Sequence, residues 1–306
     1  MTCSRRAILR GAGTAAAAWL LPEANASGER RFEPRAGAWR TFETTTEVTV
    51  IDQQGATRLW LPVPGVETGY QRSLWNAWSG NAASVRMVVD PTFAVRMLHA
   101  SFPSSVRRPT LRVVSRFQTR DRSVDWQRPV YAREDPRILH DCVQPTEWMP
   151  IDGIVRETAL AATRGATDDL ARARRIYRWV IARAHREPTV RGCGTGDVRT
   201  MLETGNLGGK CADLNAVFVA LCRAVGIPAR DVYGLRLAPS AFGYRELGAD
   251  PTKLTGAQHC RAEVFLRRYG WVAMDPADVL KVMRQETKEW IRDPSHSIRA
   301  RELGKA

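Results

Sequence analysis

The sequence predicts an α+β protein, in which an N-terminal all-β domain, a sandwich or a barrel, precedes a domain of helices and an antiparallel hairpin. Residues 39–123 consist of short β-like runs separated by turn signals. Residues 167–225 instead repeat apolar positions every three or four residues, as amphipathic helices do. Residues 258–275 return to alternation on either side of a turn. A block of strands followed by a block of helices is typical of the α+β class.

Composition excludes several classes of protein. The chain has 306 residues, of which 44% are hydrophobic and 25% charged, so it is long enough for one large or two ordinary globular domains. No run of about 18 apolar residues occurs, and no transmembrane segment is predicted in the mature chain. The net charge is +14, but only five of the 46 basic residues are lysine and the arginines are scattered. We interpret the charge as arginine-rich composition and predict no specific nucleic-acid partner.

The first 26 residues resemble an export signal. Arg5 and Arg6 precede a mildly apolar run at residues 11–21, and Ala24 and Ala26 form an A-x-A cleavage site. Paired arginines before a weakly apolar run indicate a twin-arginine signal peptide, so we expect a periplasmic or secreted protein. A buried N-terminal helix is the alternative, but it does not account for the cleavage site.

The β-rich segment is predicted as a domain over residues 37–125, with strands at 39–51, 57–61, 84–89, 93–102 and 110–119. It holds no cluster of His, Cys or paired carboxylates, so we expect it to hold or orient a partner rather than to do chemistry. A connector at residues 126–150 follows, marked by Pro129, Pro136, Pro145 and Pro150.

The second domain is predicted over residues 151–285, with a polar tail at 286–306. One helix begins after Thr167 and ends near residue 186, and a short helix at 197–203 is closed by Gly205. The best-defined helix begins at Cys211, directly after Gly208-Gly209-Lys210, carries its apolar residues on one face and stops at Gly226.

Cys211 is the candidate nucleophile. A thiol in the first turn of a helix meets unpaired backbone N–H groups and the positive end of the helix dipole, which lower its pKa from about 8.5. The preceding glycines leave room for a substrate backbone. Without Cys3 of the signal, five cysteines remain, so at least one thiol stays unpaired. Cys222, in the middle of the helix, is interpreted as a small core residue.

His259 is the candidate base, because it lies in a convincing strand at residues 258–266. A turn returns the chain to Asp275, which precedes Pro276. If Leu266 pairs with Gly270, Asp275 lies within reach of the His259 imidazole on the same face. An alternative role for Asp275 is to cap a turn at the end of its strand.

Two segments carry a family resemblance. Residues 208–235, GGKCADLNAVFVALCRAVGIPARDVYGL, and 259–275, HCRAEVFLRRYGWVAMD, resemble the transglutaminase-like superfamily, whose core is similar to papain-like cysteine proteases. The resemblance implies helices packed on an antiparallel sheet and a Cys-His-Asp triad of Cys211, His259 and Asp275. This sequence departs from the family at Arg261, a position where many members have an aromatic residue. Arg261 either competes for Asp275 or helps to bind an acidic substrate.

We therefore predict a thiol-dependent acyltransferase, or a cysteine protease or amidase, that acts on amide bonds of proteins or peptides. Hydrolysis and amine transfer both stay open, as does the oligomeric state. The alternative is a catalytically silent binding protein of the cell envelope. No CxxC or HxxxH pair and no calcium-loop motif occurs, so neither a metal nor another cofactor is predicted. Asn206 is the candidate second oxyanion donor, beside the backbone N–H of Cys211.

Overall fold

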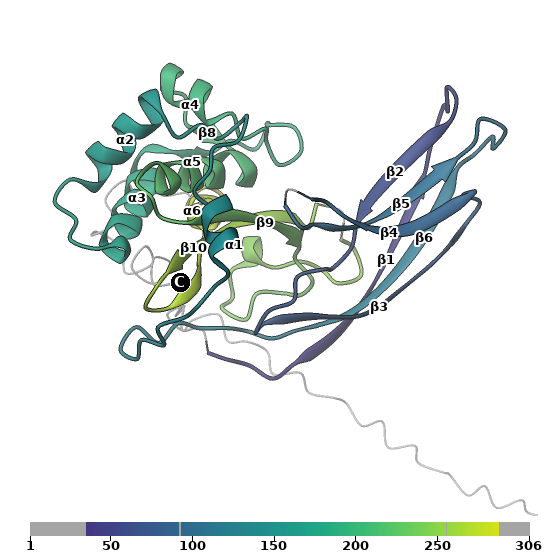
Figure 1. The fold of residues 1–306 in the computed structure, drawn as a ribbon, viewed down its shortest axis with the longest axis horizontal. Helices are drawn as coiled ribbons and strands as arrows, with labels where there is room; N and C mark the ends of the chain where they lie inside the picture. The colour runs from purple at the N-terminus through teal and green to yellow at the C-terminus, as the bar shows by residue number, and fades with distance from the viewer. Residues whose placement is uncertain (1–34, 92, 255, 288–306) are drawn as a thin grey trace, which may run out of the picture. The chain divides into compact units, whose positions relative to one another are not determined.

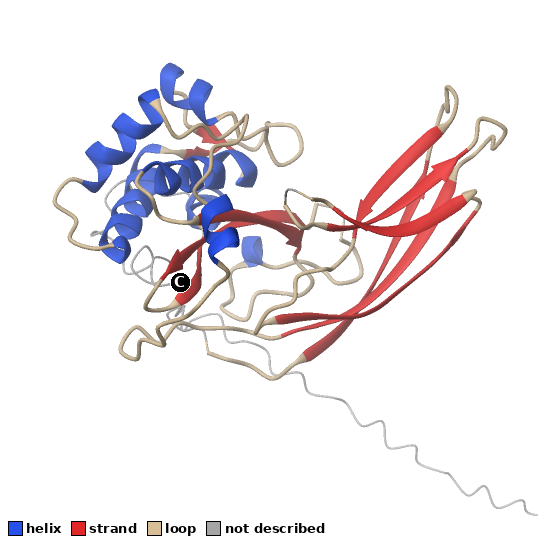
Figure 2. Cartoon of the chain, viewed as in Figure 1, coloured by secondary structure: helices blue, strands red, loops and turns tan. Residues whose placement is uncertain are grey.

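The computed structural model describes residues 35–91, 93–254 and 256–287, which are coloured in Figure 1. The predicted signal peptide and residues 288–306 of the predicted tail lie outside these ranges. Within them, no helix combines the length and apolarity that crossing a membrane requires. Six strands come first, and helices interleaved with further strands follow, so the predicted α+β class is confirmed (Figure 2).

The N-terminal strands form two antiparallel sheets of three strands each. One sheet has the order β1 (Arg40–Thr49), β6 (Thr110–Thr119) and β3 (Gln71–Gly80). The other has the order β2 (Thr57–Pro62), β5 (Arg96–Phe102) and β4 (Ser84–Val89). Buried Leu98 and Phe102 from β5 and Leu111 and Val113 from β6 belong to one apolar cluster. The two sheets therefore share a small core in the manner of a sandwich.

The C-terminal part packs helices on an antiparallel sheet of order β11 (Gly270–Met274), β10 (Gln258–Leu266) and β9 (Ala229–Leu235). Its longer helices are α2 (Gly153–Thr163), α3 (Asp169–Arg183) and α5 (Cys211–Ala224). The shorter elements are α1 (Pro136–Asp141), β7 (His185–Arg186), α4 (Val198–Thr204), β8 (Gly208–Gly209), the 3-10 helix η1 (Arg245–Leu247), α6 (Pro276–Val282) and the π-helix η2 (Met283–Thr287).

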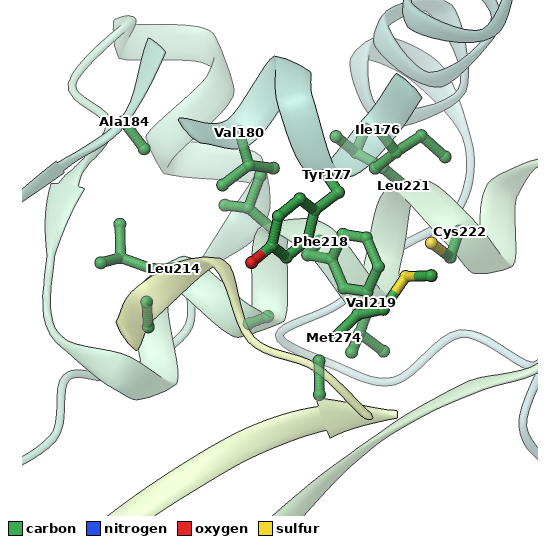
Figure 3. Packing of buried hydrophobic residues seen from close by; sticks show 14 of the residues in the cluster. Ile176, Tyr177, Val180, Ala184, Leu214, Phe218, Val219, Leu221, Cys222 and Met274 are labelled. Carbon is green, nitrogen blue, oxygen red and sulfur yellow. The ribbon is translucent and has the colours of Figure 1, made fainter. Parts of the chain in front are cut away.

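Helix α5 runs through the centre of the C-terminal core. All fourteen of its residues are buried, so the prediction of an amphipathic helix with one apolar face is wrong. A helix covered on every side needs apolar residues all round, and α5 meets the sheet on one side and other helices on the others. Figure 3 shows Phe218 of α5 against Tyr177 of α3, with ring centroids 6.0 Å apart in an edge-to-face arrangement. Cys222 is fully buried there, as predicted for a small core residue.

One buried carboxylate connects the two parts of the chain. Glu263 on β10 has no exposed surface. Its Oε1 accepts hydrogen bonds from Arg122 at 2.5 Å, Arg261 at 3.0 Å and the Tyr70 hydroxyl at 3.2 Å, and its Oε2 accepts from Arg230 at 2.9 Å. Burial alone would raise the pKa of Glu263, but the three guanidinium groups lower it to about 2. Arg261 thus has a structural role that neither sequence interpretation assigned to it.

Candidate active site

Cys211 is the first residue of α5, as the sequence predicts, and is only 6% exposed. The two residues of β8 immediately before Lys210 pair in parallel with β7, which fixes the approach to the helix. Cys211 and His259 both line a cavity of ≈ 60 Å³.

Asp213, in the first turn of α5, organises the chain around the thiol. Its carboxylate accepts hydrogen bonds from the backbone N–H groups of Lys210 at 3.0 Å and of Thr195 and Gly196 at 2.9 Å each. The buried charge is thereby satisfied by backbone donors. Gly194 has φ +99°, and a Cβ there would lie 1.9 Å from Asp213 Oδ2, so only glycine fits.

The glycines before Cys211 are explained by internal packing. A Cβ on Gly208 would lie 2.5 Å from His185 Nε2, and a Cβ on Gly209 would lie 2.4 Å from Asp213 Cβ. Both positions are too crowded for a side chain. The structure thus supplies a reason for these glycines that differs from the predicted approach of a substrate backbone.

His259 and Asp275 are brought together by the β10–β11 hairpin. Leu266 pairs with Gly270, which is the predicted register. His259 Nε2 lies 2.6 Å from Asp275 Oδ2. Cys211 and His259 line the same cavity, and His259 is among the groups that lower the pKa of the Cys211 thiol. The structure therefore brings all three predicted residues into one site, with the cysteine and the histidine on one cavity and the aspartate bound to the histidine.

Asp275 has two structural roles at once. While Oδ2 meets His259, Oδ1 accepts from the backbone N–H of Asp278 at 3.1 Å and caps α6. The predicted alternative, a cap, is thus present together with the histidine contact. Asn215, one helical turn after Cys211, donates to Asp275 Oδ1 at 3.1 Å and to the Cys260 carbonyl at 2.8 Å. These bonds hold the carboxylate in place relative to the helix that carries the thiol.

The surroundings of Cys211 favour a thiolate. The pKa of Cys211 is lowered to about 3, and the largest cause is a hydrogen bond from the Cys260 thiol. Burial acts in the opposite direction and raises this pKa. Hydrogen bonds from His259 and from the Cys260 backbone lower it further. The hydrogen bond to Cys211 also raises the pKa of Cys260, so Cys260 stays protonated and can donate. All five cysteines of the described ranges are free thiols.

The histidine is held in its charged form. Burial lowers the pKa of His259, but the neighbouring carboxylates of Asp275 and then Asp278 outweigh burial and raise it to about 9. Burial raises the pKa of Asp275, but the charge and hydrogen bond of His259, the charge of Arg236 and the hydrogen bond from Asn215 together outweigh burial and lower it. At neutral pH the site therefore contains a thiolate, an imidazolium and a carboxylate in sequence, which is the charge distribution of an activated cysteine nucleophile.

Three side chains of this site could also hold a metal ion by geometry. Ligand atoms of His259, Asp275 and Asp278 lie within 4.8 Å of one another. Each already has protein partners, however: Asp278 is bound by Arg236, and Asp275 by His259 and Asn215. The donor set is thus occupied by groups of the chain itself.

Sequence reasoning missed several residues of the site. Asn215 could have been found as a polar residue four positions after Cys211 in an otherwise apolar stretch, and therefore on the same helix face. Arg236 and Asp278 carried no local signal. Asn206, the candidate second oxyanion donor, is exposed, and its Oδ1 accepts from the Gly208 backbone N–H at 3.1 Å. It is not among the residues that line the cavity.

The sequence of this chain is similar to a known family and to a protein of Haemophilus influenzae. Residues 156–276 match the transglutaminase-like superfamily. An uncharacterized protein of Haemophilus influenzae is 34% identical over 271 residues, which cover 84% of this chain and 73% of the relative.

One solved structure has a similar fold. A Cytophaga hutchinsonii protein, provisionally described as a cysteine protease, superposes with a TM-score of 0.57 at 15% identity, over 80% of this chain and 79% of its own. The periplasmic domain of TgpA from Pseudomonas aeruginosa is a looser match, with a TM-score of 0.41 at 16% identity over 84% and 80% of the two chains. At such identities the similarity concerns the fold alone.

Proposed function

Because the chain belongs to the transglutaminase-like superfamily, we propose that it is a thiol-dependent enzyme that transfers the acyl group of amide bonds in proteins or peptides. The observation that carries the proposal is that Cys211 and His259 line one cavity while His259 Nε2 lies 2.6 Å from Asp275 Oδ2. The similarity to a structure described as a cysteine protease is in keeping with this chemistry.

The geometry supports the following reaction. The Cys211 thiolate attacks the amide carbonyl, a C–S bond forms, and the carbonyl oxygen takes the negative charge. The backbone N–H of Cys211, at the start of α5, is the natural donor to that oxyanion. The His259 imidazolium then gives its proton to the leaving nitrogen as the C–N bond breaks. Asp275 stabilises the charged ring before this step and orients it throughout.

The acyl-enzyme that results is resolved by a second nucleophile. Neutral His259 takes a proton from water or from an amine, which attacks the thioester and releases Cys211 as the thiolate. Water gives a protease or amidase, and an amine gives a transglutaminase. We also propose, from residues 1–26 alone, that the enzyme works in the periplasm or outside the cell after twin-arginine export.

An activity-based thiol probe tests the assignment of the nucleophile. We expect the unaltered protein to be labelled at one site and Cys211→Ala to lose the label. Cys222→Ala is the matched control, since Cys222 lies on the same helix and burial raises its thiol pKa, so this variant should label normally. Equal labelling of both variants would contradict the proposal and favour a silent binding protein.

The pH dependence of alkylation tests the charge state. Because the pKa of Cys211 is lowered to about 3, the rate of reaction with iodoacetamide should be near its plateau already at pH 5. His259→Ala removes one of the groups that lower this pKa, while the largest cause, Cys260, remains, so the rise of the rate with pH should shift to higher pH than in the unaltered protein. Acyl transfer should decline as pH rises through about 9, where His259 loses the proton it donates. A single rise near pH 8.5 in the unaltered protein would show an ordinary thiol.

A further inference from the structure

Arg186 is placed beside the thiol by a rigid piece of backbone. It is the second residue of β7, and its Cα pairs with that of Gly209, two residues before Cys211. Two backbone hydrogen bonds hold this pairing. The His185 N–H donates to the Leu207 carbonyl at 3.1 Å, and the Glu187 N–H donates to the Gly209 carbonyl at 2.9 Å. The position of Arg186 relative to the nucleophile is therefore set by main-chain hydrogen bonds.

Arg186 lines the same cavity as Cys211 and His259. Two other cations, Arg236 and Lys281, line it as well, with Asp278 as the carboxylate among the lining residues. The Cys211 thiolate and the His259 imidazolium cancel each other's charge. Among the described residues, Arg186 is the lining cation without an ion-pair partner in the protein, whereas Arg236 and Lys281 are each paired with a carboxylate.

The carboxylates near the cavity are held by cations other than Arg186. Asp278 is bound by Arg236. Glu246 is 3.3 Å from Lys281 and 3.1 Å from Arg245. Among the described residues, the buried Nε of Arg186 has no hydrogen-bond partner. Arg186 is thus a half-buried residue of the cavity wall whose guanidinium retains an unused donor, and it lacks the anion that would normally complete it.

We infer that Arg186 binds a carboxylate of the substrate close to the scissile amide, so that the enzyme selects acidic peptides. The inference rests on the proposed function, since it takes Cys211 as the nucleophile. The planar guanidinium suits a carboxylate because it can donate two parallel hydrogen bonds. The cavity of ≈ 60 Å³ corresponds to about four to six water-sized spheres at ~10–15 Å³ each, which is room for a carboxylate on a short stem.

Two alkylating reagents of the same shape test this without knowledge of the natural substrate. Iodoacetate carries a carboxylate next to its reacting carbon, and iodoacetamide carries a neutral amide there. We expect Arg186→Gln to lower the ratio of the two second-order rates at Cys211, iodoacetate over iodoacetamide, by about tenfold or more. Arg186→Lys should retain part of the ratio. Arg178→Gln, which removes a cation from an exposed position of α3, should leave the ratio unchanged.

The alkylation outcomes distinguish a failure of the Arg186 inference from a failure of the proposed function. If Arg186 only stabilises the thiolate, Arg186→Gln slows both reagents equally and the ratio stays constant, which overturns the inference and leaves the nucleophile in place. If neither reagent modifies Cys211 in the unaltered protein, the proposed function fails and the inference with it. A melting curve of each variant shows that it is folded.

A peptide mixture then identifies where the carboxylate comes from. The first set of peptides has amidated C-termini, and turnover is compared between peptides with Glu and with Gln beside each amide. The second set has no acidic side chains, and turnover is compared between free and amidated C-termini. Preference for Glu assigns a side-chain carboxylate, and preference for the free terminus assigns a terminal one. Either preference should vanish in Arg186→Gln. Equal turnover of acidic and neutral peptides would overturn the inference.

Discussion

Replacing Asp275 by asparagine should reduce acyl transfer by about 10³–10⁴-fold while leaving the protein folded. The carboxylate that lies 2.6 Å from His259 Nε2 would be replaced by a neutral amide, so the imidazolium would lose its counter-charge and the pKa of His259 would fall. The pKa of Cys211 would rise in consequence, because a charged His259 helps to lower it. Turnover of a peptide anilide and the pH profile of iodoacetamide alkylation measure the two effects separately.

The second role of Asp275 makes asparagine the informative replacement. Asparagine caps helices about as well as aspartate, so the bond to the Asp278 N–H and the start of α6 should survive. Asp275→Ala loses the cap as well and should lower the free energy of unfolding by about 1 kcal/mol more. Activity of Asp275→Asn within tenfold of the unaltered enzyme, with an unchanged alkylation profile, would remove Asp275 from the mechanism.

Replacing Glu263 by glutamine should destabilise the protein by about 3–5 kcal/mol, because three guanidinium groups would remain around a neutral, fully buried side chain. At about 2–4 °C per kcal/mol for a chain of this size, the melting temperature should fall by about 6–20 °C. Glu47→Gln is the matched control. Its partner Arg112 is 3.1 Å away in an exposed pair, where the loss should be about 0–1 kcal/mol.

The lowered pKa of Glu263 predicts that the folded protein loses stability in acid. The pKa of Glu263 is about 2 in the folded protein and about 4.5 ordinarily, so its contribution to stability is complete above the ordinary value and is lost as pH falls towards the folded one. Between pH 5 and 2 the free energy of unfolding should therefore fall more steeply in the unaltered protein than in Glu263→Gln. Parallel curves for the two proteins would contradict this assignment, as would a melting temperature of Glu263→Gln close to that of Glu47→Gln.

The elements that follow a strict period were predictable from sequence. The predicted strands at 84–89 and 110–119 coincide with β4 and β6, and the helix that begins at Cys211 is α5. Strand β3 was missed because a register shift between Ser73 and Trp75 breaks its alternation. Helix α6 was missed because Pro276 was interpreted only as the end of a strand, although proline is equally suited to the first turn of a helix.

The site residues were predictable to the extent that their positions follow from local geometry. Cys211 at a helix start and His259 near Asp275 in a hairpin need only spacing and register. Arg186 and Cys260 lie beside the thiol only because distant segments pack together, and nothing in their own neighbourhoods signals this. Their roles depend on tertiary contacts that one sequence does not reveal.

The hairpin arrangement also has a consequence for the order of events during folding. His259 and Asp275 are sixteen residues apart on adjacent strands, whereas the thiol is supplied by a helix from an earlier segment. Local contacts form sooner than distant ones, so we expect a refolding chain to pair the imidazole with its carboxylate before α5 docks. Until then the thiol keeps ordinary reactivity. The moment at which Cys211 becomes alkylated rapidly at pH 5 would therefore time the docking of the central helix, without any added label.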